Sequence, residues 1–286
     1  MSAMEGDPPP ELTITPPLLN SANPWATTLE DLQAIFDSPH TAAITTRTTL
    51  LDGFEHDDAV HQYAFFSPTT SLASSSARQR AKGESAPAIN PQEHAATVNN
   101  LGYSPYPLSK YLAFLKKIHK TVDKKSPQHL KPIIVSVTGT PQEIRRCYDR
   151  LDAFQDEVPN LTIAMEINLS CPNIADAPPP AYTAAGLKAY LDVLPAAPDL
   201  PVGIKTPPYT YATQFADLLD VLRKSCITSI EEVEERDRTP KPRFLSHSFA
   251  MHLSHRTAPW AVMPQAIRAQ PHPMGKSPTP QSSPPK

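Results

Sequence analysis

Residues 166–174 read Glu-Ile-Asn-Leu-Ser-Cys-Pro-Asn-Ile, and the rest of the chain is organised around them. The apolar segment before them, 161–167, is typical of a buried strand, and a proline-rich stretch follows. The proline after Cys171 ends the strand, because proline has no amide N–H to donate to a sheet. Asn168, Ser170 and the thiol need more hydrogen-bond partners than a dry interior supplies, which favours a site at this strand end. A cysteine buried for packing alone is the alternative.

Strand-like and helix-like segments alternate along most of the chain. The strand segments are centred near residues 15, 44, 134, 165 and 203. Helical spacing of apolar residues predicts helices between them, over 28–36, 108–118, 141–151, 181–194 and 215–222. This order predicts βαβ units, a parallel sheet and therefore an α/β fold. About five strands are fewer than the eight of a closed (β/α) barrel, so we expect an incomplete barrel.

Composition separates the barrel-like region from its flanks. Residues 1–11 are acidic and proline-rich, and we expect a disordered leader that is neither a signal peptide nor a mitochondrial presequence. Residues 12–223 carry the strand and helix pattern. Within them, 71–97 are rich in Ser and Ala and predict a mobile insertion. Residues 224–286 have no sustained period and predict a disordered low-complexity tail.

The overall charge and the cysteines narrow the class of protein. A net charge of -3 gives no reason to expect nucleic acid or an anionic membrane as a partner. The three cysteines, Cys147, Cys171 and Cys226, are widely spaced, which indicates a reducing compartment and neither a disulfide framework nor a metal site. No apolar run approaches the roughly 20 residues that span a bilayer. We therefore expect a cytoplasmic protein.

The segment Asn-Leu-Ser-Cys-Pro-Asn, 168–173, resembles the active-site strand of class 1 dihydroorotate dehydrogenases, and the resemblance extends over about residues 12–222. These are FMN-dependent flavoenzymes with a TIM (β/α)8-barrel fold, which oxidise dihydroorotate to orotate in de novo pyrimidine (UMP) biosynthesis. A cysteine as the base, and Pro-Pro-Tyr shortly after Lys205, resemble class 1A. This is the soluble homodimeric subclass, which uses fumarate as its electron acceptor.

The resemblance assigns the substrate-side residues. Cys171 is implied as the general base that removes a proton from C5 of dihydroorotate while hydride leaves C6. Asn168 and Asn173 would hold the carboxylate and amide groups of the substrate. A second substrate loop is matched by Asn99, Leu101, Gly102 and Tyr103.

The resemblance also assigns the flavin-side residues. Ser21 and Ala22 match a turn beside the flavin, and Asn168 is shared with the substrate. Lys205 is implied to contact the flavin ring and to stabilise negative charge on it; a solvated surface lysine is the alternative. Where the subclass has Ile-Thr-Lys, this chain has Ile-Thr-Thr-Arg, so Thr46 and Arg47 stand at a flavin- and substrate-facing position.

The chain departs from the family in its last third. With 35 prolines and 8 glycines, it has no glycine between Gly203 and Gly275, whereas the Gly-rich loops that cradle the FMN phosphate fall in that part of the family pattern. Two alternatives to an active enzyme therefore stay open. One is a truncated or frame-shifted derivative without FMN. The other is an interaction protein that uses its proline-rich tail.

Overall fold

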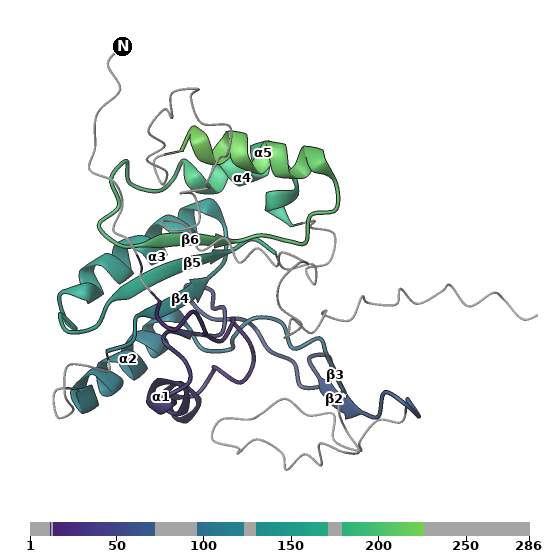
Figure 1. Ribbon diagram of the computed structural model, residues 1–286, viewed down its shortest axis with the longest axis vertical. Helices are drawn as coiled ribbons and strands as arrows, with labels where there is room; N and C mark the ends of the chain where they lie inside the picture. Colours follow the sequence, from purple (N-terminus) through teal and green to yellow (C-terminus); the bar gives the residue numbers. More distant parts are fainter. Residues whose placement is uncertain (1–11, 13, 72–95, 123–129, 171–178, 226–286) are drawn as a thin grey trace, which may run out of the picture.

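Four parallel strands form the centre of the protein (Figure 1). The computed structural model describes residues 12, 14–71, 96–122, 130–170 and 179–225. The strands lie in the order β1-β4-β5-β6, with bounds β1 Ile44–Thr45, β4 Ile133–Val137, β5 Ile163–Asn168 and β6 Val202–Lys205. The predicted α/β fold with a parallel sheet is therefore confirmed.

Helices alternate with these strands, as the sequence predicts. They are α1 Leu29–Asp37, α2 Leu108–Val122, α3 Pro141–Gln155, the short 3₁₀ helix η2 Pro180–Tyr182, α4 Ala184–Leu191 and α5 Ala212–Arg223. Both α1 and α3 begin with a capping box, in which Thr28 pairs with Asp31 and Thr140 with Glu143. The single helix expected over 181–194 is instead η2 followed by α4, because Thr183 caps a new helix at Gly186 N.

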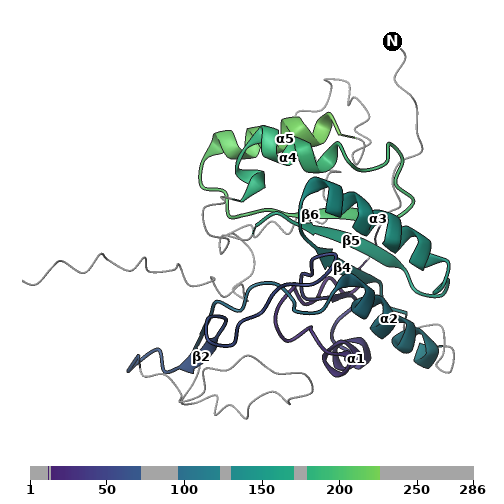
Figure 2. The ribbon, with the colours of Figure 1, turned by 180° about the vertical axis from the view of Figure 1, so that it is seen from behind.

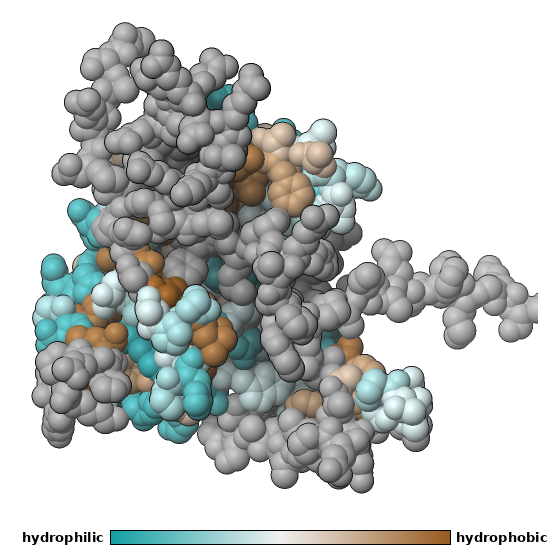
Figure 3. All heavy atoms as spheres, viewed as in Figure 1, coloured by the Kyte–Doolittle hydropathy of each residue, from teal (hydrophilic) through white to brown (hydrophobic). Residues whose placement is uncertain are grey.

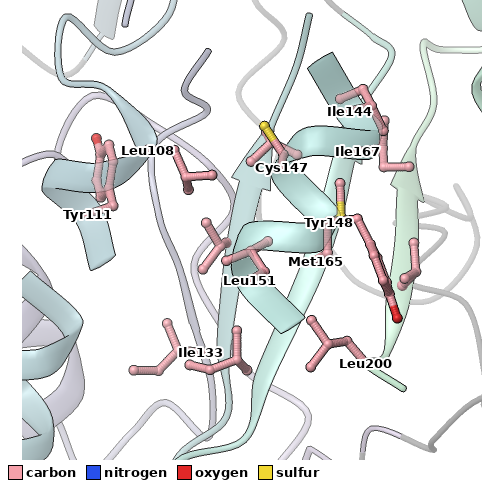
Figure 4. Packing of buried hydrophobic residues seen from close by; sticks show 14 of the residues in the cluster. Leu108, Tyr111, Ile133, Ile144, Cys147, Tyr148, Leu151, Met165, Ile167 and Leu200 are labelled. Atoms are coloured by element: carbon pink, nitrogen blue, oxygen red, sulfur yellow. The ribbon is translucent and has the colours of Figure 1, made fainter. Parts of the chain in front are cut away.

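The main core lies between the sheet and its helices. Helix α3 places Ile144, Cys147 and Leu151 against the outer face of the sheet (Figure 4), and all three are fully buried. The same side chains recur at the three- and four-residue spacing that the sequence shows, which is why this face of α3 is buried. Seen from behind, α2 and α3 lie along the sheet while α4 and α5 lie beyond β6 (Figure 2).

The inner face of the sheet changes character along the strands. Near the amino ends it is closed by a small apolar cluster of Ala43, Ile134 and Ala164, against which Leu12, Ile14 and Leu19 pack. Two residues further along β4 and β5, the residues that face inward are Ser136 and Glu166, which are paired in the register. A strand presents alternate residues to each face, so the inner face becomes polar towards the carboxyl ends of the strands.

One predicted strand needs correction, and one pair of strands was not predicted. The strand expected near residue 15 is reduced to a parallel bridge between Leu19 and Ala43, because Pro16 and Pro17 offer no amide N–H for a longer ladder. The strands β2 (Tyr63–Phe66) and β3 (Ala96–Asn99) form an antiparallel pair that the sequence analysis did not anticipate.

Residues 96–97, at the carboxyl-terminal end of the predicted insertion, belong to β3. Residues 72–95 of the insertion, the leader 1–11 and residues 226–286 of the tail lie outside the described residues. Within the described part of the chain, no helix is long and apolar enough to cross a membrane. No group of His, Cys, Asp or Glu in that part is arranged to hold a metal ion.

Candidate functional site

The carboxyl ends of the four parallel strands bring polar side chains to one edge of the sheet. Thr46 directly follows β1 and Thr138 directly follows β4, while Asn168 ends β5 and Lys205 ends β6. Asn168 and Lys205 are register partners on adjacent strands, and the main-chain N–H of Leu169 donates to the Lys205 carbonyl at 3.0 Å. This edge is where ligands bind in barrels built from parallel strands.

Asn168 is held on several sides. Its Nδ2 donates to Thr48 Oγ1 at 2.8 Å, and its Oδ1 accepts from the N–H of Ser170 at 3.1 Å and from the Ser170 hydroxyl at 2.8 Å. The hydroxyl of Thr138 donates to the Asn168 carbonyl at 3.0 Å. The side chain predicted to bind substrate and cofactor is therefore fixed in one orientation.

Thr48, Ser136 and Glu166 extend this arrangement into the sheet, and the sequence analysis did not identify them. The hydroxyls of Thr48 and Ser136 lie 2.9 Å apart, and Ser136 Oγ donates to Glu166 Oε1 at 2.6 Å. A detectable signal was present, since Ser136 and Glu166 are polar residues inside otherwise apolar strands. Buried polar groups of this kind need a partner, and the strand register supplies it.

Lys205 extends from the end of β6 next to this network and is half-buried. It forms no ion pair within the described residues, whereas Lys188, on α4, is paired with Asp192. As the register partner of Asn168, Lys205 brings a positive charge to this edge of the sheet. This arrangement could stabilise negative charge on a bound ligand.

The predicted second substrate loop follows β3. Leu101 and Tyr103 are buried, and the intervening Gly102 has φ +67°, a conformation that favours glycine. Asn99 is exposed at the end of β3, and its Oδ1 accepts from the N–H of Leu101 at 3.4 Å. The aromatic ring of Phe54 meets that of Tyr103 edge to face, with their centroids 5.9 Å apart.

Arg47 connects this loop to the end of β1. Its Nη2 lies 3.2, 3.1 and 3.0 Å from the carbonyl oxygens of Leu101, Gly102 and Tyr103, respectively. Arg47 is 4% exposed, and burial lowers its pKa to about 10. Its Nε has no hydrogen-bond partner among the described residues. Arg47 thus holds the predicted substrate loop, and contact with a flavin stays a prediction.

The amino-terminal turn lies against the same end of the sheet. Asn20 pairs with the main chain of Thr45, accepting from its N–H at 2.9 Å and donating to its carbonyl at 2.6 Å. The Ser21 carbonyl accepts from Asn20 and Asn23, and Ala22 follows in the same turn. Ser21 and Ala22 are thus anchored next to Thr46, whose hydroxyl accepts from the N–H of Ser136 at 3.1 Å.

Two predicted site residues, Cys171 and Asn173, lie outside the described residues. The described chain reaches Ser170, which bonds to Asn168. The remaining predicted residues form two groups: the strand-end group of Ser21, Ala22, Thr46, Asn168 and Lys205, and the loop group of Asn99, Leu101, Gly102 and Tyr103. Arg47 contacts the second group and, through the adjacent Thr48, lies next to the first.

A parallel α/β sheet with polar strand ends on one edge defines a class of barrel-type ligand-binding proteins, and the sequence comparisons identify the family. The pattern that describes the dihydroorotate dehydrogenase family matches residues 57–239, more than half of the chain. The chain therefore belongs to the dihydroorotate dehydrogenase family, and its fold is consistent with a partial TIM barrel of that family.

One curated relative indicates which branch of the family the chain resembles. It is the dihydroorotate dehydrogenase (fumarate) of Trypanosoma cruzi (strain CL Brener), 27% identical over 142 residues. The aligned part covers 47% of this chain and 42% of the relative. Because the match spans less than half of the relative, its complete activity is not transferred to this chain.

The family typically binds FMN, and the described residues fit the ring of that cofactor. Lys205 has no ion pair within the described part of the chain, and Asn168 retains one amide N–H without a protein partner there. A cation and a donor at the ends of adjacent strands suit the electron-rich oxygen and nitrogen edge of a flavin. Lys205, Asn168 and the Ser21–Ala22 turn are therefore the residues that would hold the ring.

Proposed function

We propose that the protein is a flavoenzyme that oxidises dihydroorotate to orotate in de novo pyrimidine biosynthesis, with FMN as cofactor and fumarate as electron acceptor. The observation that carries this proposal is the position of Asn168 and Lys205 at the carboxyl ends of adjacent strands. Family membership supplies the reaction class. The similarity to a fumarate-type relative supports the choice of acceptor.

The roles of the residues follow from their chemistry. Cys171, one residue beyond Ser170, would remove the proton from C5 of dihydroorotate, and the electron pair of that bond forms the C5–C6 double bond of orotate as hydride leaves C6. FMN, when bound, supplies the acceptor for that hydride. Lys205 would stabilise the negative charge that this transfer delivers. Asn168 and Asn173 would orient the substrate.

The loop after β3 would close the other side of the substrate. Arg47 contacts the successive carbonyls of Leu101, Gly102 and Tyr103, and Asn99 accepts from the N–H of Leu101 in the same loop. A fixed loop lowers the entropic cost of substrate binding. Thr46 and Arg47 stand where the subclass has a lysine, so in this chain the main flavin-facing cation is Lys205.

The proposal also includes the setting of the enzyme. We expect a cytoplasmic homodimer, by analogy with the subclass that the sequence resembles. Its small-molecule partners would be dihydroorotate, orotate and fumarate, and neither a membrane nor a nucleic acid would be required.

A second candidate is a family member that does not bind FMN. Strand β6 is the last strand of the sheet, and within the described residues no further strand pairs with it. An uncovered edge exposes unpaired backbone groups, which favours association or poor stability. A third candidate, recognition through the proline-rich tail, rests on composition alone.

The visible absorption spectrum of the purified full-length protein tests the proposal. A flavin enzyme absorbs near roughly 370 and 450 nm, and these bands bleach when dihydroorotate is added without an acceptor. We expect Lys205→Met to weaken FMN binding at least tenfold. Lys188→Met, which removes an exposed lysine paired with Asp192, is the matched control and should leave it unchanged. A colourless protein that takes up no added FMN would refute the proposed function and favour the second candidate.

A further inference from the structure

Four side chains from three strands or strand ends form one continuous hydrogen-bonded chain. It runs from Asn168 to Thr48 at 2.8 Å, from Thr48 to Ser136 at 2.9 Å and from Ser136 to Glu166 at 2.6 Å. All four residues are buried, with between 0% and 6% of their surface exposed. The chain therefore lies inside the sheet, and only its Asn168 end reaches the candidate site.

The chain has one direction, which follows from its two ends. The main-chain N–H of Ser170 can only donate, so the Asn168 atom that faces it must be the amide oxygen. The amide nitrogen then faces Thr48, whose hydroxyl oxygen accepts from it. At the other end, Ser136 donates to the Glu166 carboxylate. The hydroxyl hydrogen of Thr48 is therefore the one that joins Thr48 to Ser136.

This direction determines what Asn168 can offer to a ligand. A side-chain amide has two N–H donors and an oxygen with two lone pairs. The oxygen accepts from the N–H and the hydroxyl of Ser170, which uses both lone pairs. One N–H is used by Thr48. Among the described residues, the capacity of Asn168 that remains is a single N–H, and Lys205 is the register partner of Asn168 on the neighbouring strand.

We propose that Glu166, Ser136 and Thr48 are positioning residues. They hold the side chain of Asn168 in one orientation, in which it offers a single N–H donor to an oxygen of the ligand. At this point the site accepts a carbonyl or carboxylate oxygen and rejects a ligand that presents an N–H. This orientation of Asn168 follows from the hydrogen bonds of the described residues alone. The identity of the ligand as a dihydroorotate-like cyclic amide with a carboxylate rests on the proposed function.

The alternative is a network that only stabilises the fold. Such a network would not need an amide at its outer end, and its polar groups would be replaceable by apolar residues of similar volume with little loss. If the hydrogen-bonded side chains position Asn168, a substitution at Ser136 changes how firmly the Asn168 amide is held, although Ser136 forms no hydrogen bond with Asn168. A measurement on the Asn168 amide therefore distinguishes the two roles, whereas the free energy of unfolding does not.

The test follows the side-chain amide of Asn168 by NMR in the full-length protein labelled with ¹⁵N-asparagine. In Thr48→Val, which keeps the shape of the side chain but removes the hydroxyl, we expect exchange of this amide with solvent to rise about tenfold, the equivalent of one lost hydrogen bond. Thr48→Ser should restore the wild-type rate. Tyr148→Phe removes a buried hydroxyl that accepts from the N–H of Asp199 and serves as the control without effect at Asn168.

Substitutions further from Asn168 test whether the hydrogen-bonded side chains act as a unit. Ser136→Ala should increase the exchange rate of the Asn168 amide several-fold, while Glu166→Gln, which keeps an acceptor for Ser136, should leave it near the wild-type rate. An Asn168 amide that is unchanged in Thr48→Val or in Ser136→Ala would overturn the proposal.

Titration with orotate tests whether the N–H of Asn168 contacts a ligand. The free N–H of Asn168 should shift in the wild-type protein, and saturation should need at least several-fold more orotate in Thr48→Val. Orotate that binds without shifting this resonance would also overturn the proposal. A wild-type protein that binds no orotate would count against the proposed function alone, because the exchange rates are measured without ligand.

Discussion

Replacing Arg47 by methionine tests what this buried cation does. The guanidinium has no carboxylate partner within the described residues, and it lies against the carbonyls of Leu101, Gly102 and Tyr103. Methionine keeps much of the length of the side chain but removes both the charge and the donors. The expected result is a small change in the free energy of unfolding together with a large change in the local stability of the loop.

The magnitude follows from two opposing contributions. Burial lowers the pKa of Arg47 from 12.5 to about 10, which corresponds to a cost of about 3 kcal/mol for keeping the cation inside the protein. Against this, Nη2 carries two hydrogens, so it makes at most two full hydrogen bonds to the three carbonyls. At about 1.5–3 kcal/mol for each charged bond, these contribute about 3–6 kcal/mol. Arg47→Met should therefore lower the free energy of unfolding by only about 0–3 kcal/mol.

The local effect is measured by hydrogen exchange over residues 99–106. The amide of Asn100 donates to the Gln62 carbonyl, and that of Ser104 donates to the Thr48 carbonyl, so both report opening of the loop. We expect both amides to exchange about tenfold faster for each 1.4 kcal/mol of local stability lost. Arg145→Met, which removes an exposed arginine paired with Asp149, is the matched control and should leave the segment unchanged. Wild-type exchange rates in Arg47→Met would refute the reasoning.

Two further predictions concern the scaffold around the site. Burial raises the pKa of the Cys147 thiol from 9.0 to about 12. Between these pH values the folded state binds more protons than the unfolded state, so the free energy of unfolding falls as pH rises, by up to about 1.4 kcal/mol per pH unit. Urea unfolding of Cys147→Ala should show a shallower decline over that range, and an equal decline would contradict this prediction. Gly53 has φ +93°, and an added Cβ would lie 2.8 Å from the Pro105 carbonyl, so Gly53→Ala should cost about 1–3 kcal/mol in thermal unfolding. An unchanged unfolding temperature would argue against backbone strain at Gly53.

The sequence was sufficient for the elements whose pattern is local. The helices α1 and α3 were predicted from apolar spacing, and in the structure each of them begins after a threonine cap. The strand β4 was predicted from a continuous apolar run, which is the signature of a strand buried on both faces. These signals lie within a few residues of each other and do not depend on the rest of the fold.

Other features that were not predicted depend on contacts between distant parts of the chain. The pairing of β2 with β3 joins residues at least 30 positions apart across the insertion, and no local pattern specifies it. The contact between the Arg47 guanidinium and a loop more than 50 residues later in the chain was likewise not predicted, while contact of Arg47 with a flavin stays a prediction. A buried cation satisfied by main-chain carbonyls leaves no trace in composition, because carbonyls are present at every residue.

The same limit explains why the strand-end residues were recognised and the chain behind them was not. Asn168 and Lys205 belong to short motifs, whereas Thr48, Ser136 and Glu166 become related only when β1, β4 and β5 are aligned in register. Once that register is known, the polar residues inside apolar strands need partners, and the inner face of the sheet provides them.

The alternation that gives the sheet its apolar outer face also gives it this polar inner face. Met165 and Ile167 pack towards the helices, and the residues between and after them, Glu166 and Asn168, face inward. A one-residue shift of β5 would bury the carboxylate against α3 and remove the amide from the strand end. The hydrophobic core therefore specifies the register, and the register places Asn168 beside Lys205. On the face that Figure 3 shows, apolar side chains lie among polar ones.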